Sequence, residues 1–271
     1  MILIRYICII LFNSLKLIIM TTTMITPKQA KQTATIYNVG KLLSAGTSNY
    51  KTGKNKIGVT FIMYLAAGKQ NSKGVNLCPM MSLGCEAACL EEAGRGVMKP
   101  VKNSRLNKSE YYVCDKLSFL VQLAHEIMCK ITYYRNKDTT LYFRLNGTSD
   151  VDFLGQIKTH LGIDFLTFDN VVFYDYTAIL GKAKKYASTD NYIHTFSRKE
   201  DNEETCLKAL SLGFNCAMVF LNELPKTYKG YPVVSGDTTD LEMLDYKGTI
   251  LGLSAKGKAK KDMSGFVIRE Y

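Results

Sequence analysis

The stretch LYFRLNGTSD, residues 141–150, contains in ten residues the pattern on which the fold prediction rests. Leu141–Leu145 is a short run that is apolar apart from Arg144, and small polar residues follow it directly. Parallel strands that are buried on both faces have uninterrupted apolar sequences of this kind. Similar runs recur downstream at Val171–Tyr174, Tyr192–Phe196, Ala217–Leu221, Tyr231–Val234 and Ile250–Leu253.

Helical or loop segments separate most of these runs, although the last links are too short for full crossover helices. An earlier strand is predicted at Ile57–Ala66, and apolar residues between about 104 and 136 have the spacing of one helix face. This alternation predicts the α/β class, with a parallel sheet that forms a partial or closed (β/α) barrel. A doubly wound open sheet is the alternative. The 271 residues suit a single domain at 56–271, preceded by an N-terminal extension at 1–55.

The first twenty residues, MILIRYICIILFNSLKLIIM, form an interrupted apolar segment. Charged residues such as Arg5 and Lys16 leave no continuous span of about 20 apolar residues, which a membrane helix needs. We interpret the segment as a mis-assigned translation start, with Met20 or Met24 as the true first residue. A signal peptide would need a small-residue cleavage site that is not found here. A membrane anchor is the other alternative.

The composition is that of a globular protein with a basic surface. Hydrophobic residues make up 46% of the chain and charged residues 22%, which argues against a disordered chain. The net charge of +11 favours anionic partners, such as nucleic acid, a nucleotide or an acidic surface. Eight cysteines in a chain of this length are too sparse for a secreted disulfide scaffold. We therefore expect a reducing, cytoplasmic compartment.

Polar side chains gather at the carboxyl ends of the predicted strands. In parallel α/β folds ligands bind at this edge, because loops and helix N-termini converge there. A single polar residue at a strand end also fits an ordinary turn, so the recurrence at consecutive strands is what favours a ligand site. The expected contacts to a small-molecule cofactor or an anionic substrate are Arg144, Asn146, Asp150, Asp175, Ser197, Arg198, Lys256 and Lys258.

The segment LCPMMSLGCEAACLEEAGRG, residues 77–96, carries the most specific chemical signal. Cys78, Cys85 and Cys89 fall within twelve residues of one another. Cys85 and Cys89 are four apart and share a face if the segment is helical, whereas Pro79 keeps Cys78 in a loop. Three thiolates on a loop and one helical turn suit a metal or cluster with one coordination position left free.

Four interpretations of these cysteines stay open. An iron–sulfur cluster needs no ligand beyond the three, whereas zinc normally takes four, so Cys114 or a histidine would have to join them. A disulfide between two of them conflicts with a reducing compartment. Inert buried thiols are the fourth interpretation. The sequence contains no HExxH, P-loop or GxGxxG pattern, so catalytic residues are unassigned.

Several separated blocks resemble the bacteriophage gene product 88 family. They are the cysteine segment itself and the blocks FRLNGTSD, FYDYT, HTFSRKEDNE and GLSAKGKAKKDMSGFV, so the resemblance runs from about Tyr50 to the C-terminus. It implies a viral protein made in the cytoplasm of a bacterial host, and it implies no particular activity.

The spacing Cys-x6-Cys-x3-Cys after a predicted strand is also similar to the cluster-binding loop of radical S-adenosylmethionine proteins. That resemblance implies a [4Fe-4S] cluster on Cys78, Cys85 and Cys89, with S-adenosylmethionine on the fourth iron. The usual spacing in those proteins is Cys-x3-Cys-x2-Cys with an aromatic residue before the last cysteine, where this chain has Ala88. No clear glycine-rich motif for the methionine moiety follows.

Two functional hypotheses result. In the first, the chain is a barrel-like iron–sulfur protein, with an enzymatic activity of the radical S-adenosylmethionine kind. In the second, it is a non-catalytic phage accessory protein that binds nucleic acid or a host protein and whose cysteines hold structural zinc.

Overall fold

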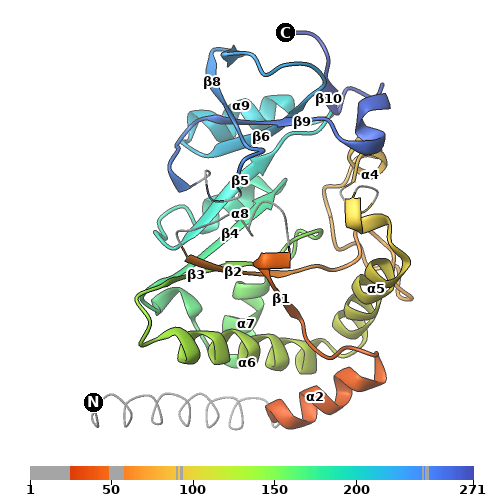
Figure 1. Ribbon diagram of the computed structural model, residues 1–271, viewed down its shortest axis with the longest axis vertical. Helices are drawn as coiled ribbons and strands as arrows, with labels where there is room; N and C mark the ends of the chain where they lie inside the picture. The colour runs from red at the N-terminus through yellow and green to blue at the C-terminus, as the bar shows by residue number, and fades with distance from the viewer. Residues whose placement is uncertain (1–24, 49–57, 90, 92–93, 240, 242–243) are drawn as a thin grey trace.

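The computed structural model describes residues 25–48, 58–89, 91, 94–239, 241 and 244–271 (Figure 1). Within these residues ten strands form one sheet in the order β1-β2-β3-β4-β5-β6-β9-β8-β7, and β10 pairs with β6. All neighbours from β2 to β8 along this order are parallel, whereas β1 and β7 pair antiparallel at the two edges. The strands are β1 (Leu43–Ala45), β2 (Gly58–Met63), β3 (Thr140–Arg144), β4 (Val171–Thr177), β5 (Tyr192–Ser197), β6 (Asn215–Phe220), β7 (Thr227–Tyr228), β8 (Tyr231–Ser235), β9 (Ile250–Ser254) and β10 (Val267–Ile268).

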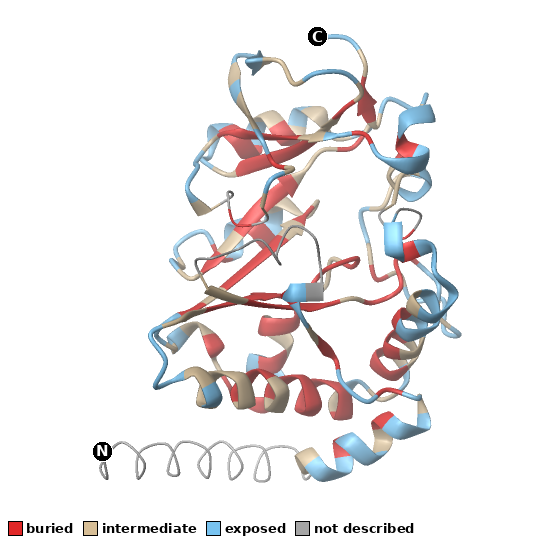
Figure 2. Ribbon diagram, in the orientation of Figure 1, coloured by how far each residue is buried: buried red, intermediate tan, exposed pale blue. Residues whose placement is uncertain are grey.

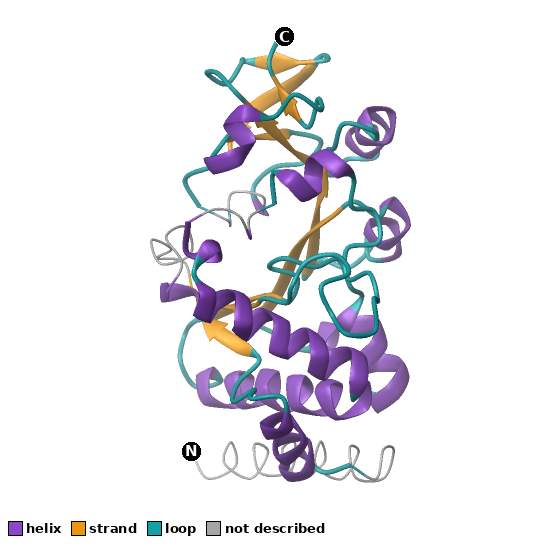
Figure 3. Cartoon of the chain, turned by 90° about the vertical axis from the view of Figure 1, so that its right-hand side faces the viewer, coloured by secondary structure: helices purple, strands orange, loops and turns teal. Residues whose placement is uncertain are grey.

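The helices that connect the first strands pack on one face of the sheet. Phe61, Phe143 and Phe173, from three adjacent strands, are buried in one core with residues of α5, α6 and α7. A second core joins β5, β6 and β9 to α9 on the same side, and the side view shows helices flanking the strands (Figure 3). The helices are α2 (Pro27–Ile36), α4 (Leu83–Ala87), α5 (Lys99–Cys114), α6 (Lys116–Tyr134), α7 (Phe153–Leu161), α8 (Leu180–Lys185) and α9 (Glu203–Ser211).

The opposite face of the sheet is covered differently. Tyr142, Tyr174 and Leu251 form a smaller core there, with Leu241 and Leu244 from the link between β8 and β9. Figure 2 shows the strands buried throughout the middle of the molecule, between these two layers. Sequential strand order with connecting helices on one face is the winding of a (β/α) barrel rather than of a doubly wound sheet.

The predicted α/β class and the largely parallel sheet are confirmed, and each predicted apolar run contains or overlaps a strand. Pairing among the described residues gives an open sheet with β1 and β7 at its edges, and no pairing closes it. The region from about 104 to 136, predicted as one helical stretch, is two helices that meet at Asp115. The links around β7 and β8 carry no crossover helix in the described residues, in agreement with their short length.

Residues 25–48, which the sequence analysis assigned to a loose extension, pack against the rest of the fold. Thr26 and Gln29 form a reciprocal capping box at the start of α2. Ala30 and Ala34, on the inner face of α2, are fully buried, and the hydroxyl of Tyr111 donates to the carbonyl of Ala30 at 2.8 Å. Their polar neighbours are mostly exposed, which explains why the composition of the segment suggested an extension.

The interpretations of residues 1–20 lie outside the described residues. Among the helices that are described, none combines the length and the apolar composition needed to cross a membrane.

The packing of α2 leads to a stability prediction. Ala34→Asp places an unpaired carboxylate in the fully buried contact of α2, so the free energy of unfolding should fall by about 3 kcal/mol. Gln32→Asp, at an exposed position of the same helix, is the matched control and should change it by less than about 0.5 kcal/mol. Urea unfolding curves measure both. Equal curves for the two variants would show that α2 does not contribute to the folded domain.

Candidate functional site

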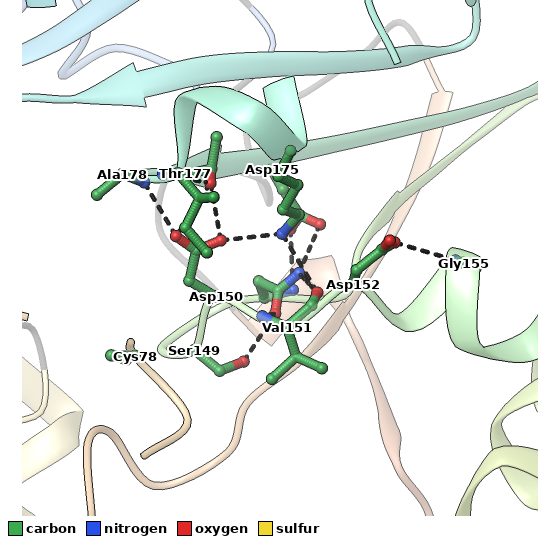
Figure 4. A network of polar contacts seen from close by, with 12 residues as sticks. Cys78, Ser149, Asp150, Val151, Asp152, Gly155, Asp175, Thr177 and Ala178 are labelled. Carbon is green, nitrogen blue, oxygen red and sulfur yellow. Dashed lines mark hydrogen bonds and ion pairs between the residues drawn. The ribbon is translucent and has the colours of Figure 1, made fainter. Parts of the chain in front are cut away.

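The loop after β3 is organised by a buried carboxylate on β4 (Figure 4). Asp175 accepts hydrogen bonds from the backbone N–H of Asn146 at 2.9 Å, from its side-chain amide at 2.8 Å and from the hydroxyl of Tyr192 at 3.0 Å. The Oδ1 of Asn146 in turn accepts from Ser149 Oγ and from the N–H of Val151. Complete burial raises the pKa of Asp175 above its usual value. The side chain of Asn146 thus fixes the turn of residues 146–151.

This turn contacts the segment that carries the first cysteine. The N–H of Asp150 donates to the carbonyl of Leu77 at 2.8 Å, and Thr148 Oγ1 donates to the carbonyl of Leu65. The thiol of Cys78 lies 3.4 Å from the carbonyl oxygen of Thr148. Because these bonds join the end of β3 to the chain that follows β2, they hold Cys78 at the carboxyl edge of the sheet.

Asp150 connects the same turn to the next strand. Its carboxylate accepts hydrogen bonds from Oγ1 of Thr177, the last residue of β4, at 2.8 Å and from the N–H of Ala178 at 2.9 Å. The ammonium of Lys182 on α8 lies 3.0 Å away, and both side chains of this ion pair are at least nine-tenths buried. A buried pair with this many additional hydrogen bonds is well compensated for its loss of hydration.

The helical part of the cysteine segment is attached to a different strand end. Glu200, which follows β5, accepts hydrogen bonds from the N–H of Gly84 at 2.7 Å and from Ser82 Oγ at 2.8 Å. Ser82 also caps α4 by accepting from the N–H of Cys85. Glycine at position 84 allows this close approach, because a Cβ there would lie 2.8 Å from the Glu200 carboxylate and 2.1 Å from Ser264 Oγ, and both side chains would have to shift.

The C-terminal segment also packs against α4 and its C-terminal end. Ala88 packs against a small core formed by residues of η6 (Gly257–Lys261) and β10. Arg198, at the end of β5, donates from Nη1 to the carbonyls of Gly265 at 2.6 Å and Phe266 at 2.9 Å and so holds this segment in place. The cysteine segment therefore contacts the chain after β3, the chain after β5 and the C-terminal segment.

The three predicted ligand thiols are half-buried neighbours at this edge. Burial raises the pKa of Cys78 to about 12, and the charges of Cys89 and Cys85 act in the same direction. Burial likewise raises the pKa of Cys85 to about 11, whereas the positive charge of Lys199 opposes the rise. Among the described residues, however, no three Cys, His, Asp or Glu side chains are grouped closely enough to hold a metal ion. The assignment of the cysteines as ligands stays a prediction.

The other predicted site residues are divided between two places. Asn146, Asp150 and Asp175 belong to the network beside Cys78, and the guanidinium of Arg144 lies 4.7 Å from the ring centroid of Tyr176. Arg198 is engaged with the C-terminal segment, and Lys256 pairs with Asp237 at 2.5 Å. Ser197 is half-buried and Lys258 is exposed. Their expected roles as ligand contacts stay predictions.

Sequence reasoning missed the two residues that meet the cysteine helix. Lys199 and Glu200 directly follow the predicted strand end, yet in the run SRKEDNE they have the composition of a solvated loop. Lys199 is only 3% exposed, although its partner Asp201 is largely in solvent. The sequence did offer one signal for Lys199 and Glu200, because they directly follow Arg198 at the end of a predicted strand.

The fold and this edge define a class of protein: a singly wound α/β protein with a cysteine-bearing loop at the carboxyl edge of its sheet. A family model described as gene product 88 matches residues 29–270, and the chain belongs to this family of phage proteins. The resemblance noted in the sequence is thereby confirmed. No curated protein and no solved structure matches the chain. The similarity to radical S-adenosylmethionine proteins thus has no further support and stays a prediction.

The contacts of Glu200 predict the accessibility of the thiols. Glu200→Ala removes two hydrogen bonds to a charged acceptor, so α4 should detach more often and Cys85 should react with a thiol reagent about tenfold faster. Peptide-resolved mass spectrometry of labelled protein measures this rate. Glu204→Ala, at an exposed position on α9, is the matched control and should leave the rate unchanged. Equal rates in the two variants would contradict the docking role of Glu200.

Proposed function

We propose that the chain binds an iron–sulfur cluster through Cys78, Cys85 and Cys89, and that it presents a small anionic ligand to that cluster. The observation that carries the proposal is the attachment of one short segment with three thiols to the ends of both β3 and β5. The carboxyl edge of a parallel sheet is where α/β proteins place their ligands.

The donor set fits such a cluster in kind. Three cysteine thiols that influence one another electrostatically are the ligands that iron–sulfur centres use, and they leave one iron open. Because the thiols are not grouped at ligand distances, binding requires the loop of Cys78 and the end of α4 to draw together. When bound, a cluster of this kind supplies one-electron chemistry at the open iron.

The surrounding residues have separate roles in this proposal. Asn146 and Asp150 hold the loop of Cys78 in position, and Glu200 holds α4. Lys199 places a buried positive charge near Cys85, which favours a ligand with a carboxylate or phosphate group. S-adenosylmethionine, which has a carboxylate, is the ligand that the sequence resemblance suggests.

Metal analysis of anaerobically purified protein tests the proposal. The full chain should contain about four iron and four sulfide ions and should absorb visible light. Cys78→Ala, Cys85→Ala and Cys89→Ala should each lose iron while keeping a folded circular dichroism spectrum. Cys129→Ala, at a half-buried thiol of α6, is the matched control and should keep the iron.

Two other results of the metal analysis would contradict the cluster. One zinc ion per chain, lost in the same three variants, would support the structural-zinc alternative and overturn the cluster. Metal content that is zero, or that does not depend on the three cysteines, would overturn both.

A further inference from the structure

Two large apolar side chains protrude from the surface beside the cysteine segment. Leu83, the first residue of α4, is 84% exposed, and Met263, just after η6, is 80% exposed. The residues that follow them, Gly84 and Ser264, are in contact, and α4 and η6 lie side by side in Figure 1. Leu83 and Met263 therefore each lie one residue from this contact, and we call the exposed residues around it the α4–η6 surface.

The α4–η6 surface has a positively charged margin. Residues 256–261 contain four lysines and no acidic residue, and Lys258, Lys260 and Lys261 are exposed while Ala259 anchors the turn. Lys256 is paired with Asp237 and is not counted in this margin.

Two of the nearby carboxylates are used inside the protein, whereas Glu86 on α4 is exposed. Glu200 accepts from Ser82 and from the backbone of Gly84, and Asp262 accepts from Ser264 and from the backbone of Val267. Glu200 and Asp262 therefore hold the two segments together, and Glu86 is one acidic group beside the lysines of η6.

The packing of α4 against the C-terminal segment does not require Leu83 and Met263 to be exposed. The contact between the two segments is made by Gly84, Ala88 and Ser264, and α4 is already capped by Ser82. Exposed apolar side chains with a polar rim mark sites of protein association. A nucleic acid would use the lysines but would gain little from the two apolar side chains, because phosphate contacts dominate its binding.

We propose that the α4–η6 surface is a docking site for an acidic protein of the host cell. The partner contributes an apolar pocket for Leu83 and Met263, and its carboxylates face the lysines of η6. The inference stands on the surface alone and does not depend on which metal the cysteines bind.

The test uses the full chain made in bacterial cells with a photo-crosslinking amino acid at position 83. The same amino acid at position 36 is the matched control, because Ile36 is 76% exposed on the distant helix α2. Mass spectrometry identifies the crosslinked product, and the dissociation constant of the purified product is then measured at two salt concentrations. We expect one predominant acidic protein from position 83 that position 36 does not capture.

Substitutions then examine the two halves of the surface. Leu83→Ser should weaken binding of the purified partner about tenfold or more, which corresponds to 1.4 kcal/mol, and Lys260→Glu with Lys261→Glu should do the same and reduce the salt dependence. Ile36→Ser should leave the dissociation constant unchanged. Metal content measured in the same preparations keeps this test separate from that of the cysteine site.

Three results would overturn the inference. One is equal capture at positions 83 and 36, and another is no product at position 83. The third is capture of nucleic acid, with a salt-dependent affinity for a DNA or RNA oligonucleotide that Leu83→Ser does not alter.

Discussion

The carboxylate of Asp175 on β4 lies fully buried between the end of β3 and the start of β5, and the geometry of the turn after β3 depends on it. Burying a charge is costly unless hydrogen bonds and opposite charges offset the loss of hydration. Here three hydrogen bonds from Asn146 and Tyr192 and the charges of Lys182 and Arg144 offset part of this loss, and burial still raises the pKa of Asp175. Since two of the three bonds come from Asn146, the same contacts fix the turn that follows β3.

That turn also fixes the position of the cysteine segment through hydrogen bonds. Residues 146–151 bond to the carbonyls of Leu65 and Leu77, so the chain after β2 follows the shape that Asp175 imposes. The second attachment, through Glu200, lies two strands away. The cysteine segment is therefore attached at two points, near Cys78 and at the start of α4. Between these two points the described chain forms no strand. This combination of fixed ends and an irregular centre is suited to enclosing a small group.

The sequence predicted the sheet well because buried parallel strands have a distinctive composition. Runs such as Val171–Tyr174 are apolar throughout, and Asn146 and Asp175, which follow two of these runs, are hydrogen-bonded to each other. The contact of Glu200 with Gly84 was not predictable, because it joins residues 116 positions apart through tertiary packing. Nor was the packing of α2, whose two buried alanines are too small to mark an apolar face among polar neighbours.

Hydrogen exchange in Asp175→Asn tests the central claim most directly. Asparagine replaces one acceptor oxygen with a donor that meets the side-chain amide of Asn146, so the turn should lose its anchor. The account predicts that the backbone amides of Asn146, Asp150 and Val151 exchange about tenfold faster or more, while the amides of α6 keep their wild-type rates. Unchanged exchange in residues 146–151, or an equal acceleration throughout the protein, would contradict it.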